Sequence, residues 1–152
     1  MEGKVFPQVP ASNVDHSEIQ KDERYWYEFP VMMKYLKRKV KGWGIASFFE
    51  QMGVNKIALY AITDFTEITA DDLKKDGMEV VCICDKNKSK IFSDYCGYPL
   101  IGVDELVKKY HSAEIEKILV CSLMHEKYIF RDLMKQGVAL EDIISISSAV
   151  FS

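Results

Sequence analysis

Three short, almost wholly apolar segments constrain the fold of this chain more than any other feature of the sequence. They read KIALY, MEVVCICD and KILVCS, and they begin at Lys56, Met78 and Lys117. Near-continuous hydrophobic runs of this length are typical of parallel strands that are buried on both faces. Because segments with apolar residues at helical spacing lie between them, strand and helix alternate over residues 56–146. The sequence therefore predicts a parallel sheet with right-handed connections and helices on both faces.

The segments between these strands carry helix signals. Residues 64–75 offer a capping pair in Asp64 and Glu67, and residues 103–110 and 128–134 each contain an apolar stripe. Two further strands complete the expected sheet. The third strand along the chain is a short one around PLI, and the last is IISIS. This order predicts a Rossmann-like α/β domain, although a flavodoxin-like winding has the same alternation.

The N-terminal third differs from the rest of the chain. Residues 1–20 are polar and have no periodicity, so we expect a mobile tail there. A helical extension over 21–53 follows, with a first helix over about 29–40 that holds Pro30 in its first turn. The Rossmann-like domain would then occupy residues 54–152.

This extension carries more large apolar groups than a folded protein leaves in water. We expect them to pack against the sheet domain, against a second copy of the chain, or against a protein partner. The residues concerned are Tyr25, Trp26, Phe29, Met32, Leu36, Phe48 and Phe49. A row of basic residues lies beside this stripe and fits either peripheral contact with anionic lipid or a solvated face. These are Lys34, Lys37, Arg38, Lys39 and Lys41.

Length and charge limit the classes of function. A chain of 152 residues is the size of one domain, and 20 Lys and Arg against 23 Asp and Glu give a net charge of -3. Because this balance creates no basic field, nucleic acid is not expected as a partner. The sequence has neither a membrane-spanning apolar run nor the apolar core of a signal peptide, so we expect a cytoplasmic protein.

The cysteines and histidines do not predict a metal site. Cys82 and Cys84 alternate with Val81 and Ile83, so both should point to one face of a strand and fill the core as small hydrophobic groups. All four cysteines lack the spacing of a zinc site or a secreted disulfide framework, and we expect them to be reduced. The three histidines are scattered along the chain. No metal is therefore expected.

The turn after the first strand is the first candidate for a ligand site, because ligands of open α/β sheets bind outside the carboxyl ends of the strands. It reads YAITDFTEI, and Ala61, Thr63 and Thr66 stand where a dinucleotide-binding fold has G-x-G-x-x-G. The Thr63 side chain would occupy space that pyrophosphate needs. We therefore expect no bound cofactor and, at most, weak binding of a nucleotide or nucleotide sugar.

Any ligand would contact both sides of a crevice between the first and fourth strands. One side would be the turn formed by Ala61, Ile62, Thr63, Asp64, Phe65 and Thr66. The other would be Ser122 and His125 after the fourth strand, with His125 as a general acid or base or simply as a helix-entry residue. Asp85 ends the second strand, 24 positions after Ala61 (85 − 61), where it would meet ribose hydroxyls or form a turn.

Four segments follow one another in a recognisable order: SFFEQMGVNKIALY, DDLKKDGMEVVCICDKN, YPLIGVDELVKKY and KILVCSLMHEKYIFRDLMKQG. Together they resemble a Rossmann-like domain of bacterial surface-polysaccharide proteins. That family often occurs beside or fused to glycosyltransferases and is related to the nucleotide-binding part of nucleoside-diphosphate-sugar dehydratases and epimerases. The likeness runs from Gly44 to Ser148, about two thirds of the chain. It departs from the family at the altered phosphate loop, and Tyr128 and Arg131 do not form the Tyr-x-x-x-Lys pair of the epimerases.

These observations support two hypotheses from different classes. The first is a non-catalytic accessory module of surface-polysaccharide or glycosyl-transfer pathways that acts through protein contacts. The second is an enzyme that modifies or binds sugar nucleotides, with a phosphate site rebuilt from Thr63, Thr66 and the following helix N-terminus. A titration with NAD, UDP and UDP-sugars would discriminate between them.

Overall fold

The computed structural model describes residues 16–87 and 94–152. Within these residues the strands form one sheet in the order β3-β4-β2-β1-β5-β6. The strands are β1 (Lys56–Tyr60), β2 (Glu79–Cys84), β3 (Asp94–Tyr95), β4 (Tyr98–Ile101), β5 (Lys117–Val120) and β6 (Ile143–Ser145). All neighbouring pairs are parallel except β3 with β4.

The strand order settles the winding. Taken in chain order, the five parallel strands lie as 3-2-1-4-5, which is the Rossmann order rather than the flavodoxin-like one. Strand order reverses between β1 and β5, which pair from Ile57 with Lys117 to Tyr60 with Val120. The chain leaves the carboxyl ends of both strands at this switch point.

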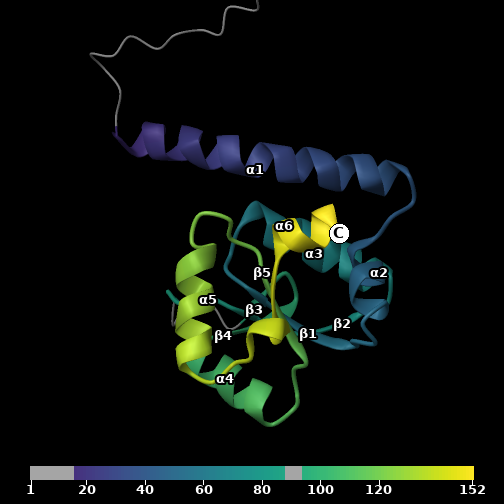
Figure 1. Ribbon diagram of the computed structural model, residues 1–152, viewed down its shortest axis with the longest axis vertical. Helices are drawn as coiled ribbons and strands as arrows, with labels where there is room; N and C mark the ends of the chain where they lie inside the picture. The colour runs from purple at the N-terminus through teal and green to yellow at the C-terminus, as the bar shows by residue number, and fades with distance from the viewer. Residues whose placement is uncertain (1–15, 88–93) are drawn as a thin grey trace, which may run out of the picture.

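Helices cover both faces of the sheet, as predicted (Figure 1). One face carries α1 (His16–Val40), α2 (Ile45–Glu50), α3 (Asp64–Lys75) and α6 (Ile146–Phe151). The other carries α4 (Val103–His111) and α5 (Glu126–Lys135). Each face has its own core cluster because side chains alternate along a strand: Leu59 of β1 points to the first and Tyr60 to the second.

The expected cysteine pair is confirmed. Cys82 and Cys84 are both fully buried in the core beneath α4 and α5. Burial raises the pKa of the Cys82 thiol to about 12, and it raises the pKa of the Cys121 thiol on the other face to about 12 as well. Cys96, in the turn between β3 and β4, is exposed.

The N-terminal helix is longer than the sequence suggested. It begins at His16 rather than near residue 29, so residues 16–20 are helical and not part of a tail. Residues 1–15 lie outside the described residues. Pro30 sits inside the helix rather than in its first turn. Its side chain is exposed, so water can bond the carbonyl that a proline cannot satisfy.

Three elements were not predicted, namely β3, α6 and a 3-10 helix over Leu140–Asp142, and one signal was misread. The segment IISIS is divided between β6 and the start of α6, and β3 adds an antiparallel strand at the sheet edge. Helix α3 has the predicted bounds, but its N-cap is Thr63, which bonds with Thr66 instead of a pairing of Asp64 with Glu67. The Thr66 hydroxyl accepts from the Thr63 N–H, the bond that a Glu or Gln side chain makes in the usual capping box.

Polar contacts hold the C-terminal half of α1 against the body of the domain. The Tyr35 hydroxyl donates a hydrogen bond of 2.5 Å to the Asp72 carboxylate on α3, and Lys39 forms an ion pair with the same carboxylate. The Arg38 guanidinium donates to the carbonyl of Val150 on α6 at 2.8 Å. Both Tyr35 and Asp72 are buried.

The expected burial of the aromatic stripe holds only in part. Phe49 is fully buried and Met32 and Phe48 pack on the same core. In contrast, Tyr25, Trp26, Phe29 and Leu36 are exposed, so the sheet domain of this chain does not cover them. Figure 1 shows α1 crossing one side of the domain, with its N-terminal end reaching past the elements below it. None of the described helices combines the length and apolar character needed to cross a membrane.

Candidate functional site

The crevice at the switch point is the first candidate site. The loops after β1 and β5 lie side by side there, because the two strands are neighbours in the sheet. A cavity of about 420 Å³ opens between them and the end of β2. It is lined by Tyr60, Ala61, Asp85, Lys86, Asn87, Ser122, His125, Tyr128, Ile129 and Asp132.

Ala61 has a backbone conformation that glycine adopts more readily than other residues. Its φ is +82°, in the left-handed region that a residue with a Cβ adopts at a cost of about 1–2 kcal/mol. Its N–H bonds to the carbonyl of Cys84 at 2.8 Å, which ties the turn to β2. The turn after β1 therefore contains a left-handed residue at the position where a dinucleotide-binding loop has its first glycine.

Thr63 and Thr66 use their hydroxyl groups within the loop. The Thr66 hydroxyl is fully buried, accepts from the Thr63 N–H at 3.1 Å and donates to the Ala61 carbonyl at 2.5 Å. The Thr63 hydroxyl crosses the switch point and donates to the Cys121 carbonyl at the end of β5, at 2.7 Å. Each hydroxyl hydrogen thus goes to a backbone carbonyl and not to an open site.

Asp85 also turns back onto the loop. One carboxylate oxygen accepts from the Ile62 N–H at 3.1 Å, and the other accepts from the Asn87 N–H at 2.8 Å. The carboxylate therefore bonds a loop amide of the kind that binds phosphate in Rossmann folds. Each oxygen retains a second lone pair, so the ribose contact stays a prediction.

The β5 side of the crevice is built around the start of α5. His125 is the N-cap residue of that helix, and its N–H donates to the Ser122 hydroxyl at 3.3 Å. His125 thus occupies the helix-entry position considered from the sequence. Ser122 is buried, and its hydroxyl closes the turn by accepting this hydrogen bond.

The structure brings together some of the predicted residues and separates others. Ala61, Asp85, Ser122 and His125 line one cavity. Ile62 and Asp64 are exposed on the loop outside that lining, and Thr63 and Thr66 lie behind it. Phe65 is fully buried in the core beneath α3, so it contributes to packing and not to the crevice.

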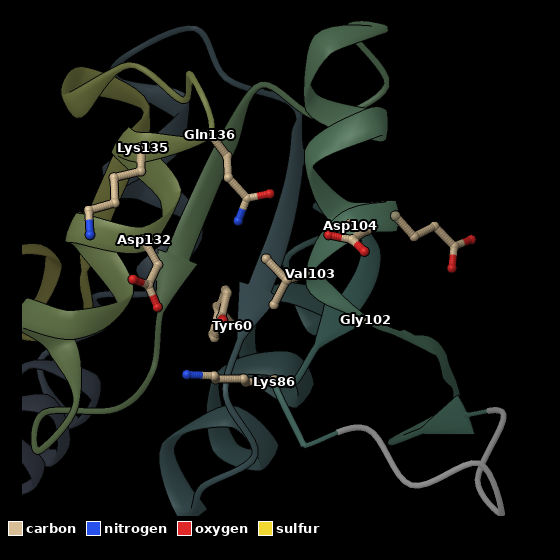
Figure 2. Close-up of a pocket in the computed structure, with 9 residues that line it drawn as sticks. Tyr60, Lys86, Gly102, Val103, Asp104, Asp132, Lys135 and Gln136 are labelled. Atoms are coloured by element: carbon tan, nitrogen blue, oxygen red, sulfur yellow. The ribbon is translucent and has the colours of Figure 1, made fainter.

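A second cavity, of about 690 Å³, continues from the first between α4 and α5. The two share Tyr60, Lys86 and Asp132. Figure 2 shows Tyr60 between Asp132 on α5 and Val103 on α4, with Lys86 alongside. The remaining lining residues are Gly102, Asp104, Glu105, Lys135 and Gln136. This groove therefore carries charges of both signs.

Tyr60 is 3% exposed and reaches both cavities. Burial raises the pKa of its hydroxyl, and Cys84, Asp85 and Asp132 add to this effect. The hydroxyl thus stays protonated at neutral pH and can donate a hydrogen bond.

Sequence reasoning missed Tyr60, Lys86 and Asp132. Two signals could have found them: Tyr60 is the last residue of the first strand, and Lys86 follows the acidic strand end directly. Asp132 gives no signal of its own, because one acidic residue on an amphipathic helix is ordinary. Within residues 16–87 and 94–152, no group of acidic, cysteine or histidine side chains is arranged to hold a metal ion.

The model of a family described as C2185-like, N-terminal, matches residues 53–144. This range begins just before β1 and ends within β6, so it includes both cavities. No curated protein matches the sequence.

Proposed function

Since the chain belongs to the C2185-like, N-terminal family, and since that family region contains the whole crevice, we propose a function for the Rossmann-like fold that does not require a dinucleotide. The protein is a non-catalytic accessory module that acts through protein contacts. Its phosphate loop is closed by its own side chains.

The observation that carries this proposal is the closed hydrogen bonding of the loop. The Thr63 hydroxyl links the loop to β5 across the switch point, and Asp85 bonds the Ile62 amide. A pyrophosphate at this position would have to break both interactions. It would also face the negative charge of Asp85, and like charges in such a site repel by several kcal/mol when poorly solvated.

The first turn of α3 adds to the same effect. Asp64 and Glu67 both lie there and offset the positive end of the helix dipole. The helix N-terminus that binds phosphate in related folds therefore attracts anions less strongly. We further propose that the protein acts in the cytoplasm. On the resemblance described from the sequence, we assign it to a surface-polysaccharide or glycosyl-transfer pathway.

Calorimetric titration tests the closed loop. We expect NAD, NADP, UDP and UDP-sugars to give no saturable heat with the wild-type protein at micromolar concentrations. Thr63→Gly combined with Asp85→Ala removes both interactions and should allow measurable binding of a nucleoside diphosphate. Thr63→Glu is the matched control and should bind none of these ligands. A one-to-one site of micromolar affinity in the wild-type protein would contradict the proposal.

One observation favours binding of a sugar nucleotide as a second candidate. The two joined cavities fall within the size range of small-molecule sites, and Lys86 and Tyr60 offer donors to a ligand that avoids the closed loop. In that case Thr63→Glu would leave binding unchanged, because the ligand lies elsewhere, whereas Tyr60→Phe would weaken it.

A further inference from the structure

Helix α1 has two apolar faces, and among residues 16–87 and 94–152 only one of them packs against the domain. The inner face contains Val31 and Tyr35, which are buried against the domain. The outer face contains Trp26, Phe29, Leu36 and Val40, whose exposed fractions are 72%, 64%, 49% and 89%. Such large aromatic and aliphatic groups, gathered on one helix face, mark an interaction surface.

The spacing of the outer face is that of a coiled coil. Its residues, with the half-buried Met33 included, follow at steps of three, four, three and four, which is the heptad pattern of helix pairing. We call this set the outer seam: Trp26, Phe29, Met33, Leu36 and Val40. It is about 21 Å long, at 1.5 Å per residue. Because the outer seam is offset by two positions from Val31 and Tyr35, about 200° around the helix, it points away from the domain.

Charges beside the seam favour one orientation. Glu23 lies near its start and Lys37 near its end, both exposed and on the same flank of the helix. In an antiparallel pair Glu23 of one copy meets Lys37 of the other on each side. In a parallel pair the Lys34, Lys37 and Lys41 side chains of both copies would gather at one end, and like charges repel.

We propose that the outer seam binds the outer seam of a second copy of this chain, so that two α1 helices pair antiparallel about a two-fold axis. The pairing places Trp26 against Leu36 of the second copy and Phe29 against Met33 of the second copy. The two domains lie on opposite outer sides of the helix pair and do not collide, because each is attached to the inner face of its own α1. This inference rests on the proposed function, because it identifies the protein contact through which the module acts.

Analytical ultracentrifugation of the full chain, over a wide range of protein concentration, tests the pairing. The wild-type protein should be a dimer. Leu36→Glu buries a charge in the seam, and Trp26→Ala removes its largest group, so each should raise the dissociation constant by about thirtyfold or more. Met134→Glu, at a residue on α5 that is 48% exposed, is the matched control and should leave the dimer unchanged.

A charge exchange tests the orientation. Glu23→Lys and Lys37→Glu should each weaken the dimer by about threefold to tenfold, and the double variant should recover the wild-type dissociation constant. A double variant as weak as either single one would overturn the antiparallel arrangement. Leu36→Glu should also melt cooperatively, at the temperature of wild-type protein diluted below its dissociation constant, because the residue is exposed in the single chain and only the dimer's added stability is lost.

Two results would overturn the proposal as a whole. One is a wild-type protein that stays monomeric at high concentration. The other is a monomer that binds anionic lipid vesicles through Leu36, which would assign the seam to a membrane surface. Nucleotide titration of the Leu36→Glu variant tests the closed loop separately from the helix pairing, since it measures nucleotide binding to the crevice in a protein that no longer dimerises.

Discussion

Two sets of polar groups, one on each side of the sheet, differ in what they bond. On the side of α1 and α3, Tyr35, Lys39 and Asp72 bond to one another. On the side of α4 and α5, the Tyr60 hydroxyl and the Asp132 carboxylate border an open groove. The first arrangement stabilises the fold, and the second leaves groups available to a ligand. The difference can be measured residue by residue.

Asp72→Ala should have the largest effect on stability. It leaves a buried tyrosine hydroxyl and a lysine without their partner, which costs about 2–3 kcal/mol, with the lower end favoured because Lys39 is partly exposed. Asp132→Ala in the groove is the control and should change the free energy of unfolding by about 0.5 kcal/mol or less. Urea denaturation measures both values. Equal losses would remove the distinction between the two sides.

Thr66→Val should cost about 1–3 kcal/mol, because a buried backbone donor and acceptor in the loop lose their partner. Thr69, one turn further along α3, provides the comparison. Its hydroxyl is buried without a hydrogen-bond partner among the described residues, so Thr69→Val should be neutral or slightly stabilising. The two melting curves should therefore shift in different ways, and a loss of stability in Thr69→Val would show that its hydroxyl is bonded.

Ala61→Gly should stabilise the protein by about 1 kcal/mol, because glycine adopts a positive φ without a steric penalty. Chemical denaturation measures the gain. As a control, Ala113→Gly tests the same substitution at another positive φ, of +62°, far from the crevice. A loss of stability at position 61 would mean that its methyl group contributes more by packing than the turn costs.

Glu28→Gln should have the smallest effect, a change in how the free energy of unfolding depends on pH. Burial raises the pKa of Glu28 above 4.5, Arg24 opposes the shift, and Asp64 on α3 adds to it. The folded state therefore holds the proton more tightly than the unfolded state, so stability rises as pH falls from the folded pKa towards 4.5. Glu28→Gln should lose this slope. A wild-type curve parallel to that of the variant would contradict the shift.

The sequence predicted the alternating sheet because buried parallel strands give a clear local signal. KIALY, EVVCIC and KILV became β1, β2 and β5 with little change in their bounds. The bounds of α3 also followed from local signals. The start of α1 did not, because a proline in its interior and a polar first half read as a break in the helix.

A cavity lies at the switch point where the sequence predicted a crevice, but the contacts within it were not predictable. The altered glycine positions could be read directly, whereas the bond from Thr63 to the Cys121 carbonyl depends on two strands brought together by folding. The same holds for Asp85, whose carboxylate reaches a loop amide 23 residues earlier in the chain. Asp132 enters the groove only because α5 packs beside α4.

The distribution of thiols makes this protein suitable for site-specific labelling without mutagenesis. Cys82, Cys84 and Cys121 are shielded inside the two core clusters, while Cys96 is exposed at the turn between β3 and β4. Burial raises the pKa of the three inner thiols, and partial burial and the nearby Glu67 raise that of Cys96 as well, so exposure selects the site. A maleimide dye should therefore attach at Cys96 alone while the fold is intact. A fluorophore there would sit at the sheet edge. Uptake of further dye would then report the opening of either core, so that one reagent both marks the molecule and times its unfolding.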